Sequence, residues 1–144
     1  MIRAYQEPDL ASLMSLWLES TTLAHPFINQ EYWRESAGQV RDVYIPQSQT
    51  WVYEEQGQII GFISVLDACF IGALFVEQRF HGKHIGAALI RHVQQYFPLL
   101  LLEVYQQNER ACAFYRKQGF VVTAEHFNHE TQATTLIMQW ASKE

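Results

Sequence analysis

The sequence predicts a mixed α/β fold in a single domain that spans residues 1–144, and three observations predict it. Short apolar runs typical of strands alternate with segments of helical spacing. Proline and glycine stand between most of these segments. The composition, 49% hydrophobic and 17% charged, supplies side chains for one core and is unlike that of a disordered chain.

The first part of the chain predicts one short strand and two helices. Residues 2–6 are the strand candidate. A helix opens at Pro8, a residue suited to a first helical turn, and its apolar residues recur at helical spacing. Pro26 ends this helix, because a proline disfavours helical geometry at the residue before it. A second helix is expected from about residue 29 to residue 44, ending before Pro46.

Three strands are expected next, at residues 50–54, 59–66 and 70–76. The first alternates apolar and polar side chains, and Gln56 with Gly57 forms the turn that leads into the second. The third is a further apolar run. The middle of the chain is therefore expected to contribute three strands to the sheet.

The last part of the chain alternates helices and strands. A helix is expected over residues 82–97, followed by a buried, leucine-rich strand at residues 99–105. A second helix spans residues 108–118 and ends at Gly119, a residue suited to helix termination. Two final strands are expected at residues 120–127 and 134–140. The strand–helix–strand passages imply some parallel pairing.

Charge and composition exclude several classes of protein. Fifteen acidic and ten basic residues give a net charge of −5, which argues against nucleic-acid binding and favours a cationic substrate such as an amine. The N-terminal residues carry no apolar signal-peptide core, and no apolar run is long enough to span a membrane. Cys69 and Cys112 lack C-x-x-C spacing, and no histidine pair has metal-ligand spacing. We expect a cytoplasmic, reduced protein without a metal, as a monomer or a homodimer.

A basic loop with glycines precedes the helix expected after residue 82. A helix N-terminus offers unpaired N–H groups and the positive end of a dipole, which suits phosphate. Gly82 and Gly86 allow a ligand to approach the backbone closely. An ordinary loop with solvated basic residues explains the same composition, and the spacings of a P-loop and of a dinucleotide fingerprint are absent. The basic side chains of this loop are Arg79, His81, Lys83 and His84.

The segment after residue 107 carries the most specific motif. An asparagine follows a buried strand, an alanine stands three residues on, a Phe-Tyr pair follows, and Gly-Phe closes the pattern. These positions are Asn108, Ala111, Phe114, Tyr115, Gly119 and Phe120. In this pattern and in the basic loop, the chain resembles the GCN5-related N-acetyltransferase (GNAT) superfamily, and the resemblance covers nearly the whole chain.

The resemblance implies a fold and a cosubstrate. The fold is a mixed, mostly antiparallel sheet of six or seven strands flanked by about four helices, with strands four and five parallel and splayed. The cosubstrate is acetyl-coenzyme A, expected in a V-shaped gap between residues 70–76 and 99–105. In the family's pyrophosphate loop, His81 here replaces an arginine or glutamine, and His84 replaces the first glycine. The implied cofactor-binding residues are Leu74, Phe75, Val76, His81, Gly82, Lys83, His84, Ile85, Gly86, Ala87, Asn108 and Tyr115.

Two side chains are candidates for proton transfer during direct attack of an amine on the acetyl group. The resemblance implies that Tyr115 is the general acid, and a phenol with a pKa of about 10 suits protonation of a leaving thiolate. Without the motif, Tyr115 would be a helix tyrosine packed beside Phe114. Glu103 can take the proton of the amine, directly or through water. A strand-end glutamate in solvent is an equally good interpretation of Glu103, and a water chain is then the base.

The acceptor amine is the least determined part of the function. His25, Phe27 and Trp33 lie where the family builds its acceptor pocket, and an aromatic pocket can hold a lysine chain or a cationic amine. Packing between two helices explains the same residues. Residues 17–34 are similar to those of a group of small bacterial acetyltransferases that includes a protein-lysine acetyltransferase. The acceptor is therefore a protein lysine or a small molecule, and a non-catalytic acyl-coenzyme A-binding or sensing module is the alternative function.

Overall fold

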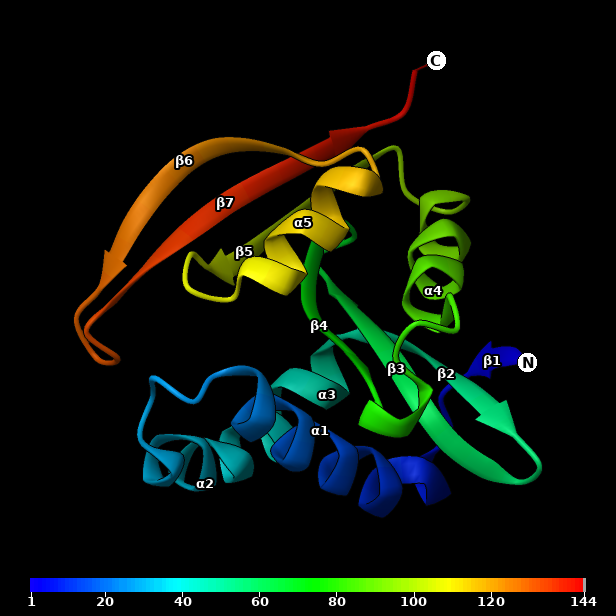
Figure 1. The fold of residues 1–144 in the computed structure, drawn as a ribbon. Coiled ribbons are helices and arrows are strands. Elements are labelled where there is room, and N and C mark those ends of the chain that lie inside the picture. Colours follow the sequence, from blue (N-terminus) through cyan, green and yellow to red (C-terminus); the bar gives the residue numbers. More distant parts are fainter. Residues whose placement is uncertain (144) are drawn as a thin grey trace.

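The computed structural model describes residues 1–143, which form one seven-stranded sheet with helices on both faces (Figure 1). The strands are β1 (Ile2–Ala4), β2 (Gln49–Glu55), β3 (Gln58–Leu66), β4 (Phe70–Val76), β5 (Leu99–Tyr105), β6 (Val121–Asn128) and β7 (Ala133–Ala141). They lie in the order β1-β2-β3-β4-β5-β7-β6. All neighbours are antiparallel except β4 and β5, which are parallel. The predicted mixed, mostly antiparallel sheet is confirmed.

Within residues 1–143, four helices of nine or more residues correspond to the four that the sequence predicts. They are α1 (Leu10–Ala24), α2 (Gln30–Gln39), α4 (Ile85–Gln94) and α5 (Glu109–Lys117). The shorter turns are η1 (Glu7–Asp9), the π-helical η2 (Val40–Tyr44), α3 (Ile45–Gln47) and η3 (Gln78–Phe80). No helix in this part of the chain is long and apolar enough to cross a membrane.

The second helix departs from the prediction at its C-terminal end. It was expected to stop before Pro46, but the chain widens into the π-helical turn η2 and continues into α3, which contains this proline. Pro46 is the second residue of α3, directly after the π-helical turn. The helical path therefore ends at Ser48, whose backbone is extended.

The helix expected from residue 82 begins later, at Ile85. Gly82 has a φ of +82° and His84 a φ of +65°, and this left-handed backbone cannot continue a right-handed helix. The three residues before Ile85 therefore form a loop that leads into α4. At its other end α4 stops at Gln94, short of the predicted residue 97.

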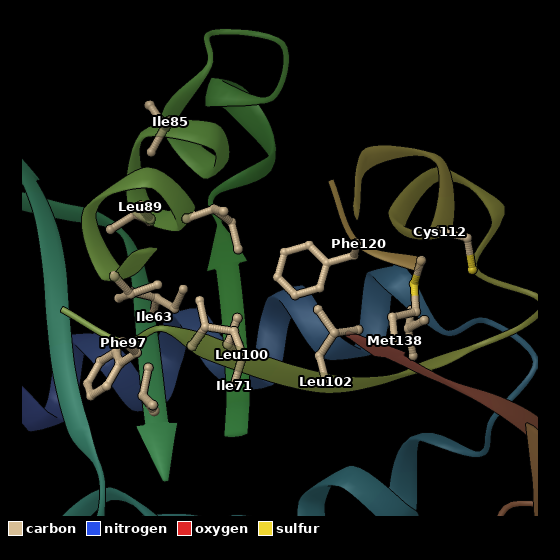
Figure 2. Packing of buried hydrophobic residues seen from close by; sticks show 14 of the residues in the cluster. Ile63, Ile71, Ile85, Leu89, Phe97, Leu100, Leu102, Cys112, Phe120 and Met138 are labelled. Carbon is tan, nitrogen blue, oxygen red and sulfur yellow. The ribbon is translucent and has the colours of Figure 1, made fainter. Parts of the chain in front are cut away.

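Two hydrophobic cores lie on opposite faces of the sheet. On one face, α4 and α5 cover buried side chains such as Leu89, Leu102, Phe120 and Met138 (Figure 2). On the other face, α1 and α2 cover a second cluster that includes Trp17. Because side chains alternate along a strand, β5 contributes to both cores. At the C-terminal end of β5, neighbouring side chains therefore point to opposite sides of the sheet.

The parallel strands β4 and β5 separate soon after they meet, and Figure 1 shows them diverging. Only two residue pairs join them, Phe70 with Leu101 and Ile71 with Leu102. Beyond these pairs, β4 continues to Val76 beside β3, and β5 continues to Tyr105 beside β7. The expected splay of strands four and five is confirmed. The gap interrupts the sheet at the point where a ligand of an open α/β sheet is expected.

Candidate active site

A cavity of about 1070 Å³ follows the gap between β4 and β5. Its wall is formed by the diverging ends of these strands, the C-terminal end of α1, the first turn of α4 and the inner face of α5. Its volume is slightly above the roughly 300–1,000 Å³ typical of small-molecule sites. The cavity reaches both faces of the sheet, because residues of both hydrophobic cores line it.

The first turn of α4 forms one end of the cavity. The N–H groups of a first helical turn have no partner within the helix, and the dipole places positive charge there. Gly86 lies in this turn, and a Cβ at this position would be 3.2 Å from the Phe114 ring of α5. The missing side chain therefore lets α5 pack against the first turn of α4. This end of the cavity is suited to the phosphate groups of a ligand.

Most of the predicted cofactor-binding residues are brought together along this cavity. Lys83 is the exception: it does not line the cavity, and its Nζ atom lies 6.0 Å from the centroid of the Phe80 ring. His81 donates a hydrogen bond from Nε2 to the carbonyl of Val76, at 2.8 Å, and so ties the loop to the end of β4. The residues that do line the cavity are Leu74, Phe75, Val76, His81, Gly82, His84, Ile85, Gly86, Ala87, Asn108 and Tyr115.

The backbone of β4 is available along the gap. Leu74, Phe75 and Val76 pair with β3 on one side. On the other side, no described residue of β5 pairs with β4 beyond Ile71. The backbone groups of β4 that point into the gap can therefore bind a ligand, and an N–H among them can stabilise negative charge on a carbonyl oxygen. These features fit the chemistry of a long, phosphorylated thioester.

Tyr115 lies in the last turn of α5, a helix that is fixed at its start by Asn108. The Asn108 side chain accepts a hydrogen bond from the N–H of Ala111 at 3.2 Å and caps the helix. The Tyr115 ring packs against Phe114 and Phe120, with centroids 5.3 and 5.7 Å away. Burial raises the pKa of Tyr115 above its usual value, and Cys112 adds to the increase. The phenol therefore holds its proton at neutral pH, and its hydroxyl has no hydrogen-bond partner among residues 1–143.

Glu103 lines the cavity from β5, on the face that α1 and α2 cover. Glu103 is exposed. Its carboxylate therefore avoids the cost of burying a charge among apolar side chains. The hydroxyl of Thr135, on the adjacent strand β7, donates a hydrogen bond to the Glu103 carboxylate. Sequence reasoning did not identify Thr135, because the β5–β7 pairing that brings it to Glu103 is not visible in local patterns.

An aromatic cluster forms the cavity wall on the α1 and α2 side. The His25 ring lies 5.1 Å from Trp33 and 5.0 Å from Tyr105, measured between centroids, and all three residues line the cavity. Phe27 does not line it and packs behind His25, at 5.8 Å. Tyr105 was not predicted as a site residue, although strand alternation places it on the same face as Glu103. The structure therefore supports both interpretations of these aromatics, as a cavity wall and as helix packing.

The backbone of His84 is strained, and this residue stands where the family's loop has a glycine. It occupies a left-handed conformation, where a residue with a Cβ is disfavoured by roughly 1–2 kcal/mol relative to its usual backbone. We expect His84→Gly to raise the free energy of unfolding by about 1 kcal/mol, after allowance for the greater flexibility of glycine in the unfolded chain. Urea unfolding of the two proteins measures this difference.

Gly82 provides the matched control for this prediction. Its φ is +82°, and nothing lies within 4 Å of a Cβ built there, so Gly82→Ala tests backbone strain without steric contact. We expect Gly82→Ala to lower the free energy of unfolding. A His84→Gly variant that is less stable than the parent would contradict the strain at residue 84.

No group of three or more histidine, cysteine, aspartate or glutamate side chains within residues 1–143 is arranged to hold a metal ion. Cys69 and Cys112 are both free thiols, the first half-buried and the second buried. Neither thiol lines the cavity. The polar side chains that line the cavity include those of Tyr115, Glu103 and His25.

Comparison with known proteins identifies relatives of the whole chain. The family model described as the acetyltransferase (GNAT) family matches residues 10–120. The peptidyl-lysine N-acetyltransferase YiaC of Escherichia coli (strain K12) is 46% identical over 140 residues, which cover 97% of this chain and 96% of that protein. The peptidyl-lysine N-acetyltransferase YjaB of the same organism is 33% identical over 123 residues, covering 85% of this chain and 82% of that protein.

Solved structures share the fold. The solution structure of the apo form of YjaB from Escherichia coli matches with a TM-score of 0.83 and 28% identity, over 99% of this chain and 97% of that one. The PaiA N-acetyltransferase from Thermoplasma acidophilum, solved in complex with coenzyme A, matches with a TM-score of 0.81 over 98% of both chains. At 20% identity, this match shows a likeness of fold alone.

Proposed function

Because this chain belongs to the acetyltransferase (GNAT) family, we propose that it transfers the acetyl group of acetyl-coenzyme A to the side-chain amine of lysine residues in proteins. The chain is an acetyl-coenzyme A-dependent N-acetyltransferase, and two of its relatives are named peptidyl-lysine N-acetyltransferases. The proposal concerns the acceptor and the residues that act on it. Its main support is the 46% identity to YiaC over nearly the full length of both proteins.

The cavity supports a binding mode for the cosubstrate. The first turn of α4 faces one end of the cavity and would hold the pyrophosphate through backbone N–H groups, with Gly82 and His84 in the loop before it. The free backbone edge of β4, from Leu74 to Val76, would hold the extended arm. When bound, acetyl-coenzyme A supplies a thioester whose carbonyl carbon accepts the amine nitrogen and whose carbon–sulfur bond then breaks.

The residues of the chain would manage the protons of this exchange. Glu103 takes a proton from the ammonium group of the acceptor, directly or through water, so that the nitrogen has a free lone pair. A backbone N–H of β4 stabilises the negative charge that develops on the acetyl oxygen. Tyr115 donates its proton to the departing sulfur. The neutral phenol favoured by its raised pKa supports this last role.

The acceptor side of the cavity has features that suit a lysine side chain. The rings of Trp33 and Tyr105 offer apolar surface for the methylene stem and electron-rich faces for a cation. The carboxylates of Glu19 and Glu103 line the same cavity and attract a positive charge. A small cationic amine would use the same features, so the acceptor has to be identified by experiment.

A comparison of acceptors tests the proposed function. Acetyl-coenzyme A would be incubated with the protein, a panel of lysine peptides and a panel of small amines, and products would be identified by mass spectrometry. We expect acetylation of lysine side chains at a kcat/KM at least about tenfold above that of the best small amine. A reaction without the protein corrects for non-enzymatic acetylation. Turnover confined to a small amine would overturn the proposed acceptor.

A further inference from the structure

The position of His25 follows from the way α1 ends. His25 is the residue after the helix, and its backbone, with φ −128° and ψ 64°, has left the helical conformation because Pro26 follows. Carbonyl groups in the last turn of a helix lack an intrahelical donor. The side chain of His25 turns back to supply one: its Nδ1 atom lies 2.7 Å from the carbonyl oxygen of Thr21. The imidazole is thereby fixed at the helix end.

This hydrogen bond determines which ring nitrogen carries the proton. A carbonyl oxygen can only accept, so Nδ1 of His25 must donate, and it carries the hydrogen. Burial lowers the pKa of His25 below its usual value, although the Thr21 carbonyl opposes the decrease, and the ring is therefore neutral at pH 7. In a neutral ring with a proton on Nδ1, Nε2 has a free lone pair. The structure thus fixes a hydrogen-bond acceptor at Nε2.

The Nε2 atom is without a protein partner in the described part of the chain but is not sealed from solvent. Only 8% of His25 is exposed, and its ring contacts Phe27, Trp33 and Tyr105. Nε2 has no hydrogen-bond partner among residues 1–143. Unlike three other polar atoms without a partner, it is still reached by solvent. Those atoms in residues 1–143 are Trp33 Nε1, His92 Nε2 and Thr131 Oγ1. His25 is also one of the residues that line the cavity.

We propose that Nε2 of His25 accepts a hydrogen bond from the acceptor amine and so positions the attacking nitrogen. The proposal rests on the proposed function and specifies how its acceptor is held. An ammonium group or amine presents N–H donors, whereas carbonyl and carboxylate groups present none to this lone pair. The cavity wall around His25 is aromatic and would hold a ligand mainly through apolar contacts. A single hydrogen-bond acceptor in this wall can therefore fix the orientation of the ligand.

His25 has a different part from Glu103 in this arrangement. The side chains that contact the imidazole come from α1, the loop after it, α2 and β5, and they are Thr21, Phe27, Trp33 and Tyr105. None of these is charged at neutral pH. Glu103 lies two residues before Tyr105 on the same face of β5 and carries the negative charge. The imidazole therefore orients the nitrogen, and Glu103 takes the proton.

Two substitutions separate the two nitrogens of the ring. In His25→Asn the amide can reach the position of Nδ1 and bind the Thr21 carbonyl, but nothing replaces Nε2. In His25→Gln the longer side chain brings an amide oxygen near the position of Nε2. With Nα-acetyl-lysine amide as acceptor, we expect His25→Asn to raise the KM of the amine at least about tenfold and to leave the KM of acetyl-coenzyme A within about twofold. We expect His25→Gln to recover most of the loss.

The opposite results would overturn the proposal. They are an unchanged KM for the amine in His25→Asn, equal losses in the two variants, or a parallel increase in the KM of acetyl-coenzyme A. Thermal unfolding of both variants shows whether a loss reflects a damaged fold. If the parent acetylates no amine at all, the proposed function fails, and binding can still be measured on the parent protein.

Binding would be measured in the ¹⁵N NMR spectrum of the histidine rings. In protein labelled with ¹⁵N-histidine and bound to coenzyme A, we expect the His25 ring to carry its proton on Nδ1 at pH 7. We expect its Nε2 resonance to shift when Nα-acetyl-lysine amide is added, and the His25→Asn spectrum assigns the signal. A ring protonated on Nε2, or an Nε2 resonance that the amine does not move, would rule out the hydrogen bond.

Discussion

Replacing Tyr115 by phenylalanine is expected to lower kcat by about 100-fold or more, with little change in acetyl-coenzyme A binding. General acid catalysis by a positioned side chain contributes typically about 10²–10⁴ in rate. The substitution removes only the hydroxyl, so the ring contacts with Phe114 and Phe120 remain. The loss should therefore appear in kcat and not in the dissociation constant of acetyl-coenzyme A, which isothermal titration measures.

The environment of the Tyr115 hydroxyl explains the size of this effect. Burial raises the pKa of the phenol above its ordinary value of about 10, so the group remains protonated throughout the physiological range. The same desolvation disfavours a free thiolate in the cavity, which increases the need for a proton donor. Because the pKa is raised, ionisation of Tyr115 should cause no loss of kcat below about pH 10.

Tyr96 provides a matched control for the Tyr115 substitution. It lies after α4, is 59% exposed and does not line the cavity. Its ring stacks on Trp51, and Tyr96→Phe keeps that contact. We expect Tyr96→Phe to leave kcat unchanged. A Tyr115→Phe variant with the kcat of the parent would remove Tyr115 from the chemistry and leave it as a packing residue of α5.

The fold could be predicted largely because its signals are local. A proline follows the end of α1, a glycine follows the end of α5, and alternation along β5 separates its two faces. Each of these elements is therefore specified by residues within a few positions of it. The errors occurred where local rules allow two outcomes. Pro46 was expected to stop a helix, yet it also fits a first turn, and the π-helical turn before it allowed the chain to use that possibility.

The site divides in the same way between local and long-range information. The donor side follows from motifs that are contiguous in the sequence, at the start of α4 and along α5. The acceptor side depends on contacts between distant segments, such as Tyr105 against His25 and Thr135 against Glu103. No pattern in one sequence specifies these contacts. The left-handed conformation of His84 was also not anticipated, although its place at a family glycine was the available signal.

The splay of β4 and β5 connects the two halves of the proposed chemistry. Tyr115 packs against the core on the α4 and α5 side, whereas His25 and Tyr105 belong to the cluster on the α1 and α2 side. In a continuous sheet, residues on opposite faces could not reach one bound molecule. Because pairing between β4 and β5 stops at Ile71, one cavity includes both sets. An amine on one side can then meet a thioester that enters from the other.

Replacing Glu103 by glutamine is the second substitution with a large expected effect. We expect kcat/KM for the amine to fall by about 100-fold at pH 7, because an acceptor that arrives as an ammonium ion must lose a proton before it can attack. Glutamine keeps the size of the side chain and can still accept the hydrogen bond of the Thr135 hydroxyl. The change therefore removes the charge and the basicity with little change in geometry.

The pH dependence distinguishes a base from a residue that only attracts the substrate. If Glu103 takes the proton, kcat/KM of the parent falls toward low pH, and this acid limb disappears in Glu103→Gln. Glu125→Gln, an exposed change of the same kind on β6, should leave the profile unaltered. An acid limb that persists in Glu103→Gln would assign deprotonation to a water chain. A loss confined to KM would then indicate that the negative charge of Glu103 serves to attract the cationic acceptor.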